Sequence, residues 1–328
     1  MKKTIAAAAA VLLIIIASCK NPPIFAAIEQ EVKLKPASVK GFVSGIVKIR
    51  GTLYTSNGKI FQKSFGTTGK WSELSTPGGR SLSIASDGTK LYAVFENNGS
   101  CTAYVHNGGW QPIDAPIRSV AGTEKVFGSD GNNIYRITDT NAVSLTGVTG
   151  ALKGAAKNYF LLETGLYKDN GTRIEGTNCP SGGLKGICDG PDNSVLIFDN
   201  STVHCYNGTG WTSIAHGVSS PLSITYLPVK QLVLVSGRAG FGEIKLATPS
   251  SVNLNGARRV SAGSADSAVP PGNYYQYKNS VGKWYLNPIA AFDNRSGYII
   301  YTGVLDNNTK YSGLWGFYYP VQIEWNRE

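Results

Sequence analysis

Histidine and methionine are scarce in this chain of 328 residues, which contains three histidines and one methionine. No Cys-x-x-Cys motif occurs, and the histidines stand far from any close pair of cysteines, so the ligand spacing of a zinc site is missing. The Gly-x-Ser-x-Gly turn of serine hydrolases and the aspartate-rich calcium loop are absent too. We therefore expect no metal, no cofactor and no catalytic residue of these kinds.

Blocks of charge and helical periodicity are also missing. Beyond residue 18, no stretch of ten or more residues repeats its apolar positions with a helical period. The formal net charge is +10, but the lysines and arginines are scattered, whereas nucleic-acid-binding proteins gather them into patches. The sequence therefore excludes a nucleic-acid partner, and its positive charge suits a position near anionic lipid headgroups.

The first residues combine a positive start with a short apolar run. Lys2 and Lys3 precede the run from Ile5 to Ile16, and Ala17, Ser18 and Cys19 follow it. A membrane span needs roughly 20 apolar residues, so this run is short for a transmembrane anchor, which is one alternative. The other alternative is that Cys19 is an ordinary cysteine.

This segment resembles a bacterial lipoprotein signal peptide, and its relaxed lipobox is similar to those of spirochaetes. The resemblance implies that residues 1–18 are removed and that Cys19 carries a diacylglycerol. Residues 19–37 would then be a lipidated tether, although residues 29–35 alternate like a strand. It also implies a lipid-anchored position in the bacterial envelope, in the outer membrane rather than the inner one.

Four further cysteines remain after Cys19. An even number in an exported chain permits disulfides. Cys179 and Cys188 flank Pro-Ser-Gly-Gly, a stretch that can turn the chain back on itself, so we predict a disulfide between them. Cys101 and Cys205 fall on separate expected strands and are expected to remain buried thiols.

A strongly apolar strand recurs along residues 38–328, followed each time by an Asn/Asp/Gly turn and an alternating strand. The successive spacings of its equivalent positions are 38, 35, 34, 35, 37 and 67, and such a period indicates a repeat architecture. Short strands in sets of about four predict an all-β propeller. We expect seven four-stranded blades, with six or eight, or a pair of β-sandwiches, as alternatives; the equivalent positions are Leu53, Leu91, Val126, Phe160, Val195, Leu232 and Ile299.

The last spacing is twice the others and predicts an insertion at about residues 256–287. This stretch contains an expected hairpin, Tyr274–Tyr277 to Lys283–Leu286, and a degenerate eighth blade is the alternative reading. It also gathers the arginines and aromatic residues that binding surfaces favour, although the same residue types pack ordinary strands. The candidate ligand-binding residues are Arg258, Arg259, Tyr274, Tyr275, Tyr277 and Trp284.

Propeller repeats of sialidases, quinone-dependent dehydrogenases, WD40 and kelch proteins carry motifs that this chain lacks, so the resemblance stops at the architecture. Most acidic residues, such as Asp87, Asp130 and Asp199, fall in expected turns, where aspartate is favoured by the backbone. We expect a membrane-anchored scaffold that binds a protein or glycan. The alternatives are a hydrolase or lyase acting on polysaccharide or peptidoglycan, which facing carboxylates at the channel mouth would indicate, and a component of an envelope assembly machine.

Overall fold

A computed structural model describes residues 37–67, 70–238, 240–248, 253–270, 284–305 and 311–328. In these ranges the chain forms 27 β-strands and one short 3-10 helix, η1 (Pro228–Lys230). The strands form seven antiparallel sheets, which confirms the expected all-β class. None of the described helical residues forms a segment long and apolar enough to span a bilayer.

We number the sheets as blades 1 to 7 in chain order. Blades 1 to 3 contain β1 (Gly45–Ile49), β2 (Thr52–Ser56), β3 (Ile60–Ser64), β4 (Ser72–Glu73); β5 (Arg80–Ser86), β6 (Leu91–Asn97), β7 (Ser100–His106), β8 (Trp110–Pro112); and β9 (Ser119–Ala121), β10 (Val126–Ser129), β11 (Asn133–Thr138), β12 (Asn141–Thr149). Blades 4 and 5 contain β13 (Leu152–Ala156), β14 (Tyr159–Leu162), β15 (Gly165–Lys168); and β16 (Gly186–Asp189), β17 (Val195–Phe198), β18 (Thr202–Tyr206), β19 (Trp211–Ala215). Blades 6 and 7 contain β20 (Ser223–Leu227), β21 (Leu232–Gly237), β22 (Gly240–Lys245), β23 (Arg258–Val260); and β24 (Tyr285–Asn294), β25 (Gly297–Leu305), β26 (Gly313–Tyr319), β27 (Gln322–Arg327).

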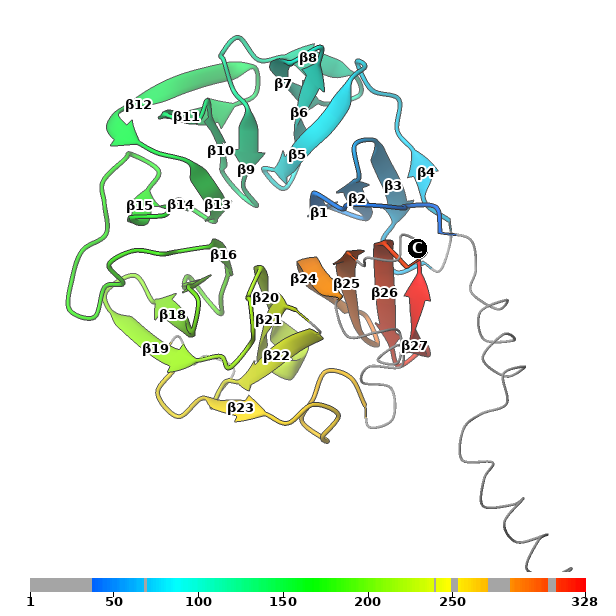
Figure 1. Cartoon of the computed structure of the whole chain (residues 1–328), viewed down its shortest axis with the longest axis vertical. Helices are drawn as coiled ribbons and strands as arrows, with labels where there is room; N and C mark the ends of the chain where they lie inside the picture. The colour runs from blue at the N-terminus through cyan, green and yellow to red at the C-terminus, as the bar shows by residue number, and fades with distance from the viewer. Residues whose placement is uncertain (1–36, 68–69, 239, 249–252, 271–283, 306–310) are drawn as a thin grey trace, which may run out of the picture. The chain divides into compact units, whose positions relative to one another are not determined.

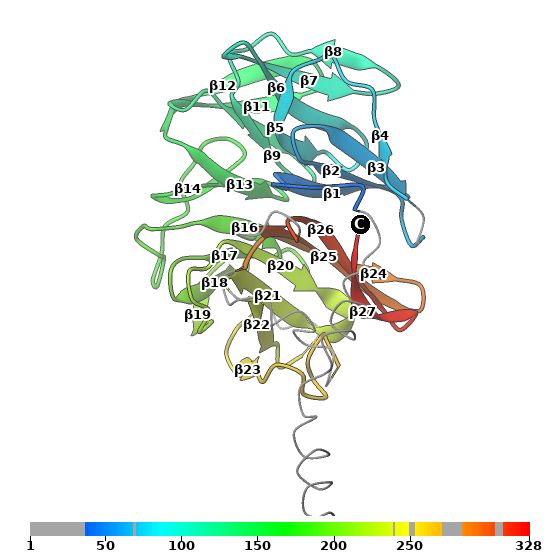
Figure 2. The same cartoon turned by 45° about the vertical axis from the view of Figure 1, so that its right-hand side comes forward.

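The seven blades are arranged around a common centre, with the first strand of each blade innermost (Figures 1 and 2). Each inner strand contacts the inner strands of both neighbouring blades, including β1 against β24, so the ring is closed. Inner strands pair on one side only, and their other edge faces the centre. The predicted seven-bladed propeller is confirmed.

The repeat found in the sequence corresponds to one structural position. Its seven equivalent residues all lie in the second strand of a blade, and each is at most 1% exposed. A strand at this position is covered by neighbouring blades on both faces, which explains its continuous apolar character. The sequence period therefore counts blades.

Aspartates shape several turns, as their positions in the sequence predict. Oδ1 of Asp130 accepts hydrogen bonds from the backbone N–H groups of Asn132 and Asn133, at 2.8 and 2.7 Å. Its other oxygen accepts the hydroxyl of Tyr135 at 3.0 Å. Hydrogen bonds from Asn133 and Asn132 hold the pKa of Asp130 well below its usual range. Asp87 and Asp199 likewise accept hydrogen bonds from the backbone N–H groups two and three residues further along the chain, so these carboxylates stabilise turns.

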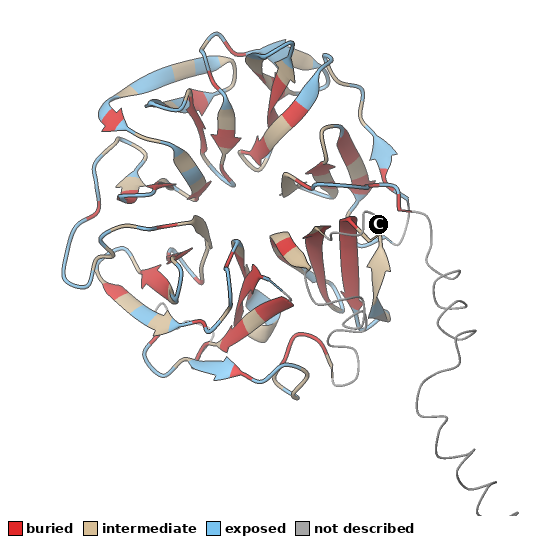
Figure 3. Ribbon diagram, in the orientation of Figure 1, coloured by how far each residue is buried: buried red, intermediate tan, exposed pale blue. Residues whose placement is uncertain are grey.

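The hydrophobic core lies between the blades. Separate buried clusters fill the spaces between blades 7 and 1, 1 and 2, 2 and 3, 3 and 4, 4 and 5, and 5 and 6. Figure 3 shows that burial is concentrated in the middle strands, whereas outer strands such as β4 and β12 are largely exposed. Each fully buried aliphatic side chain contributes about 1.5–3 kcal/mol to stability. Because these side chains lie between blades, the contacts between neighbouring blades supply much of the stability of the ring.

Blade 4 departs from the expected four strands, because its sheet has only three. A short segment stands where the fourth strand would lie: the N–H of Ile174 donates to Leu166 O at 2.8 Å, and that of Lys168 donates to Thr172 O at 2.9 Å. Gly176 then adopts φ of +135°, a conformation that favours glycine, and Pro180 has no N–H to donate. Pairing therefore stops after one bridge.

The long last spacing corresponds to the connection between blades 6 and 7, where residues 261–284 join β23 to β24. The expected hairpin is wrong at its second strand, because Tyr285 and Leu286 begin the inner strand of blade 7 and pair with Leu305 and Val304. Its first strand lies outside the described residues. The start of the connection is fixed by Glu243, whose buried carboxylate accepts bonds from Ser267 Oγ and Ala268 N, at 2.5 and 2.6 Å.

The ring closes where the beginning and end of the described chain meet. The N–H of Val39 donates to Glu328 O, and Val39 O accepts the N–H of Leu314 in β26, both at 3.0 Å. The strand β27 fills the outer position of blade 7. Chain segments from both ends therefore contribute to the last blade.

A buried ion pair reinforces this closure. Lys63 Nζ of blade 1 lies 2.6 Å from Glu328 Oε2, and their side chains are 2% and 7% exposed. Trp71 Nε1 donates to the same oxygen at 2.8 Å, and the Tyr318 hydroxyl donates to Oε1 at 2.6 Å. Burial, followed by the charge of Glu328, raises the pKa of Tyr318 far above its usual value, so its hydroxyl stays a donor. We call Lys63, Trp71, Tyr318 and Glu328 the closure network.

We expect Glu328→Gln to lower the free energy of unfolding by about 3–5 kcal/mol, because it leaves the buried Lys63 ammonium without its counter-charge. Urea unfolding measures this loss, and Lys63→Met added to Glu328→Gln should recover part of it. The matched control is Glu324→Gln, at an exposed position on β27. Equal stabilities for Glu328→Gln and the control would show that the ion pair does not hold the ring closed.

Candidate functional site

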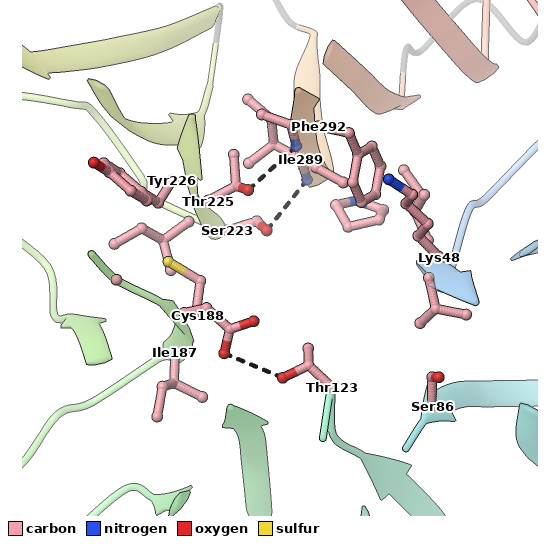
Figure 4. A pocket seen from close by; sticks show the side chains of 18 of the residues that line it. Lys48, Ser86, Thr123, Ile187, Cys188, Ser223, Thr225, Tyr226, Ile289 and Phe292 are labelled. Atoms are coloured by element: carbon pink, nitrogen blue, oxygen red, sulfur yellow. Dashed lines mark hydrogen bonds between the residues drawn. The ribbon is translucent and has the colours of Figure 1, made fainter. Parts of the chain in front are cut away.

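A cavity of about 950 Å³ lies at the centre of the ring. Residues from all seven blades line it, and they belong to the inner strands or to the turns that follow them (Figure 4). A volume of this size is at the upper end of those that bind small ligands. The cavity is therefore the candidate functional site.

The ends of the inner strands decide the chemistry of the cavity. Because every blade repeats the same strand order around the ring, all inner strands run in the same direction and their carboxyl ends meet at one mouth. Apolar side chains line the wall farther back along these strands, among them Ile46, Ile84, Ile187, Ile224 and Ile289. Carboxylates lie at the strand ends or in the turns beyond them. We call these residues the acidic rim: Glu124, Asp189, Asp192 and Asp293.

Asp189 is fixed by contacts that connect three blades. The Thr123 hydroxyl of blade 3 donates to Asp189 Oδ1 of blade 5 at 3.1 Å, and it accepts the N–H of Lys157 from blade 4 at 3.3 Å. The Lys157 ammonium donates to Gly190 O at 3.2 Å and also to Asp192 O. Hydrogen bonds among the polar groups around Asp189 and Asp192 therefore hold this part of the acidic rim in place.

Burial raises the pKa of the Asp189 carboxyl, and the nearby Glu124 charge adds to the rise. The Thr123 hydrogen bond and the Lys157 charge oppose it. A carboxyl with a raised pKa beside a second carboxylate can hold or release a proton nearer to neutral pH than an isolated one. Asp189 is the rim residue with the most perturbed environment.

Lys48 lies on the opposite side of the mouth, next to Phe292 (Figure 4). Its Nζ lies 3.7 Å from the ring centroid of Phe65 and 5.8 Å from that of Phe292. Burial lowers the pKa of Lys48, and Asp293 opposes the change. The mouth thus already holds one ammonium group between aromatic faces and a carboxylate.

Two hydroxyl groups connect blades 6 and 7 at the cavity wall. Ser223 Oγ accepts the N–H of Ile289, and Thr225 Oγ1 accepts the N–H of Ala291, both at 3.2 Å (Figure 4). These N–H groups lie on an inner edge that has no neighbouring strand within its blade, so the hydroxyls satisfy donors that would otherwise face the cavity. Burial raises the pKa of the adjacent Tyr226 to about 12, and the Asp293 and Asp192 charges contribute.

Three of the residues expected to bind a ligand lie in the described part of the chain, away from the cavity. Arg258 and Arg259 are exposed on β23, where Arg258 pairs with Asp266 and Arg259 lies beside Gly217. Trp284 packs against Tyr311 and Trp315, with ring centroids 5.9 and 6.1 Å apart. None of these three residues lines the cavity. The other three, Tyr274, Tyr275 and Tyr277, lie outside the described residues, as does Cys19, and a binding role for the set stays a prediction.

The predicted disulfide is not formed, because Cys179 and Cys188 are both free thiols. Cys188 packs into the cluster between blades 5 and 6, whereas Cys179 packs with Ile187 into the cluster between blades 4 and 5. Since Ile187 and Cys188 are consecutive in β16, their side chains point to opposite faces of the strand. Instead, Cys179 Sγ contacts Ile174 O at 3.3 Å.

Sequence reasoning missed the acidic rim, because its members are spread from residue 124 to residue 293. The signal that was available is a polar residue at or just after the end of an inner strand, for example Glu124, Lys157 and Asp189. Within the ranges that the structure describes, no three histidine, cysteine, aspartate or glutamate residues are grouped so as to hold a metal ion.

Comparison with known proteins agrees with the first residues of the chain. The model of the TP013X lipoprotein family matches residues 1–180 and 194–328. The chain belongs to this family. Two lipoproteins of Treponema pallidum (strain Nichols), both described as uncharacterized, are each 25% identical to it; the alignments cover 95% of this chain and 93% and 96% of the relatives.

A solved structure supports the architecture independently. The WD40 β-propeller domain of Doa1 matches with a TM-score of 0.53 and 11% identity, covering 85% of this chain and 97% of that one. At this identity the likeness concerns the fold alone. The chain is thus a member of a lipoprotein family with a propeller fold, and its function has to be argued from its own site.

We expect Thr123→Val to raise the pKa of Asp189 further, because the hydroxyl that stabilises the ionised carboxylate is removed. Lys157→Met should act in the same direction. Carboxyl-carbon NMR titration of the aspartates measures both, with Thr89→Val as the control, because the Thr89 hydroxyl donates to the turn carboxylate of Asp87. An unchanged or lowered pKa of Asp189 in Thr123→Val would contradict the described contact.

Proposed function

We propose that this TP013X protein is a membrane-anchored, non-catalytic binding protein of the bacterial envelope, and that its ligand enters the central cavity through the acidic rim. The observation that carries the proposal is the cavity itself, about 950 Å³ in volume and lined by all seven blades. A ligand there would contact strand ends that the ring holds in fixed positions. Binding would then need little rearrangement of the protein, which favours affinity.

The anchor in this proposal is Cys19. Membership of a lipoprotein family and the Ile-Ala-Ser-Cys sequence at residues 16–19 support lipidation there. Each buried CH₂ of an acyl chain contributes about 0.8 kcal/mol, and two or more chains hold a protein durably on a bilayer. We place the domain on the outer membrane, tethered by residues 19–37.

Several contacts favour binding over bond chemistry. Asp189, Thr123 and Lys157 hold one another, Asp293 Oδ1 accepts the N–H of Val229 at 3.1 Å, and the Lys48 ammonium rests on aromatic rings. These groups are engaged in contacts that keep them in place, which is typical of a preorganised recognition surface. A protein or glycan that projects a group into the mouth fits this arrangement.

A second function has one specific observation in its favour. Glu124 and Asp189 line the same mouth, and the Glu124 charge contributes to the raised pKa of Asp189. Glycoside hydrolases pair a protonated carboxylic acid with a second carboxylate on either side of the bond they cleave. A hydrolase or lyase acting on polysaccharide or peptidoglycan is therefore the alternative.

One experiment separates the two functions. Ala290 lines the cavity, so Ala290→Phe should obstruct it, whereas Val143→Phe, on the exposed face of β12, is the matched control. We expect the full chain to bind peptidoglycan fragments or envelope polypeptides. This binding should be lost in Ala290→Phe and retained in Val143→Phe, and the bound ligand should be recovered uncleaved. Binding that is unchanged in Ala290→Phe would refute the cavity as the binding site. Cleavage that stops in Asp189→Asn would establish the hydrolase instead.

The anchor is tested by growing cells with an alkyne analogue of palmitate. We expect the full chain to be labelled and Cys19→Ala to be unlabelled, because the acyl groups depend on that sulfur. Cys101→Ala is the control, since this thiol lies on β7 of the described domain. Equal labelling of Cys19→Ala would remove Cys19 as the attachment site.

A further inference from the structure

We propose that the group recognised in the cavity is cationic: a primary ammonium or guanidinium group presented by a lysine or arginine side chain of a peptide. This inference rests on the proposed function and names the ligand chemistry of the same cavity. It combines the charge of the mouth, the way its carboxylates are held, and an ammonium group that the mouth already accommodates.

The mouth has the opposite charge to the chain as a whole. Among the residues that line the cavity are four carboxylates and one lysine, whereas the full sequence carries a formal charge of +10. A concave site lined by one sign of charge focuses the field and raises the local concentration of the opposite charge. An anionic ligand would be attracted to most of this protein but repelled from its mouth.

The carboxylates surround the opening from different parts of the ring. Glu124 follows β9 of blade 3, Asp189 and Asp192 belong to blade 5, and Asp293 is near the end of β24 in blade 7. A group entering the cavity would pass between them. The arrangement is thus formed by the closed ring and does not depend on a single acidic loop.

Nearby lysines are already engaged in other contacts. The Lys157 ammonium is held by the carbonyl groups of Gly190 and Asp192, and Lys125 pairs with Asp169. Asp189 and Asp293 are oriented by Thr123 Oγ1 and by the N–H of Val229. Carboxylates held in this way lose little freedom when they accept a cation, which reduces the cost of binding.

Lys48 shows how the mouth accommodates an ammonium group. Its Nζ packs over Phe65 and faces Phe292; burial lowers the pKa of Lys48, and the charge of Asp293 opposes this change. A second lysine or arginine from a ligand would find the carboxylates of the acidic rim and the aromatic rings of Phe292 and Tyr226, with isoleucine side chains deeper in the cavity for its methylene groups. This combination suits a basic side chain better than the hydroxyl groups of a neutral sugar.

The test measures binding of short peptides to the full chain, purified from membranes in detergent. We expect acetyl-Lys-Lys-Lys-amide to bind, and its triply acetylated form and acetyl-Glu-Glu-Glu-amide to bind at least 10-fold more weakly. Spermidine is included because a free polyamine offers the same ammonium groups. If spermidine bound and the lysine peptide did not, the cavity would recognise a cation, but the ligand would be a polyamine and the peptide would be ruled out.

Variants locate the peptide. Asp189→Asn combined with Asp293→Asn should weaken binding of the lysine peptide about 10-fold, whereas Asp114→Asn, an exposed acid between blades 2 and 3 that does not line the cavity, should have no effect. Binding should also weaken as the pH falls, because protonation of Asp189 removes its charge. The groups that set this pH dependence are Thr123, Lys157 and Glu124, which face the carboxyl.

The outcomes distinguish this inference from the proposed function. Equal binding of the lysine, acetyl-lysine and glutamate peptides by the unmodified protein would overturn the cationic inference even if the variants failed to fold. If a neutral glycan bound and was lost in Ala290→Phe, the cavity would remain the site and only the ligand class would be wrong. If no probe or envelope ligand responded to Ala290→Phe, both would fail.

Discussion

The contact between Lys63 and Glu328 is the interaction on which the ring depends. It joins blade 1 to the last residue of the sequence at 2.6 Å, in an environment where both side chains are almost completely buried. Because the core lies between blades, a ring with one open joint would expose the cluster that blades 7 and 1 share. Hydrogen bonds from Trp71 and Tyr318 complete the coordination of the carboxylate, so the ion pair is compensated and can stabilise the closed form.

Closure also determines the site. No single blade contains the acidic rim, whose residues come from blades 3, 5 and 7, and Lys48 is supplied by blade 1. Hydrogen bonds from backbone N–H groups of β24 to the hydroxyl oxygens of Ser223 and Thr225 connect the last blade to the wall of the cavity. The outer strands contribute no residue to the lining of the cavity.

The fold was largely readable from the sequence because its strongest signal is local. Each second strand contains a buried apolar position at a regular spacing, from Leu53 to Ile299, because neighbouring blades cover the strand. The inner strand β24 was missed because Tyr285 and Leu286 were interpreted as the second strand of a hairpin in the expected insertion. The disulfide failed because spacing says nothing about which face of β16 a side chain occupies. Glu124, Asp189 and Asp293 come together only through the closed ring, which no local pattern describes.

The central claim is that closure of the ring holds the channel mouth in shape. Native-state hydrogen exchange of the backbone amides in Glu328→Gln tests it most directly. The amide of Val39 reports the closure, and the amides of Ile289 and Ala291 report the wall of the cavity. We expect all three to lose protection together relative to the unmodified protein, while amides of β14 in the distant blade 4 change least. Unchanged protection of Ile289 and Ala291, with Val39 exposed, would show that the mouth forms without the closure network.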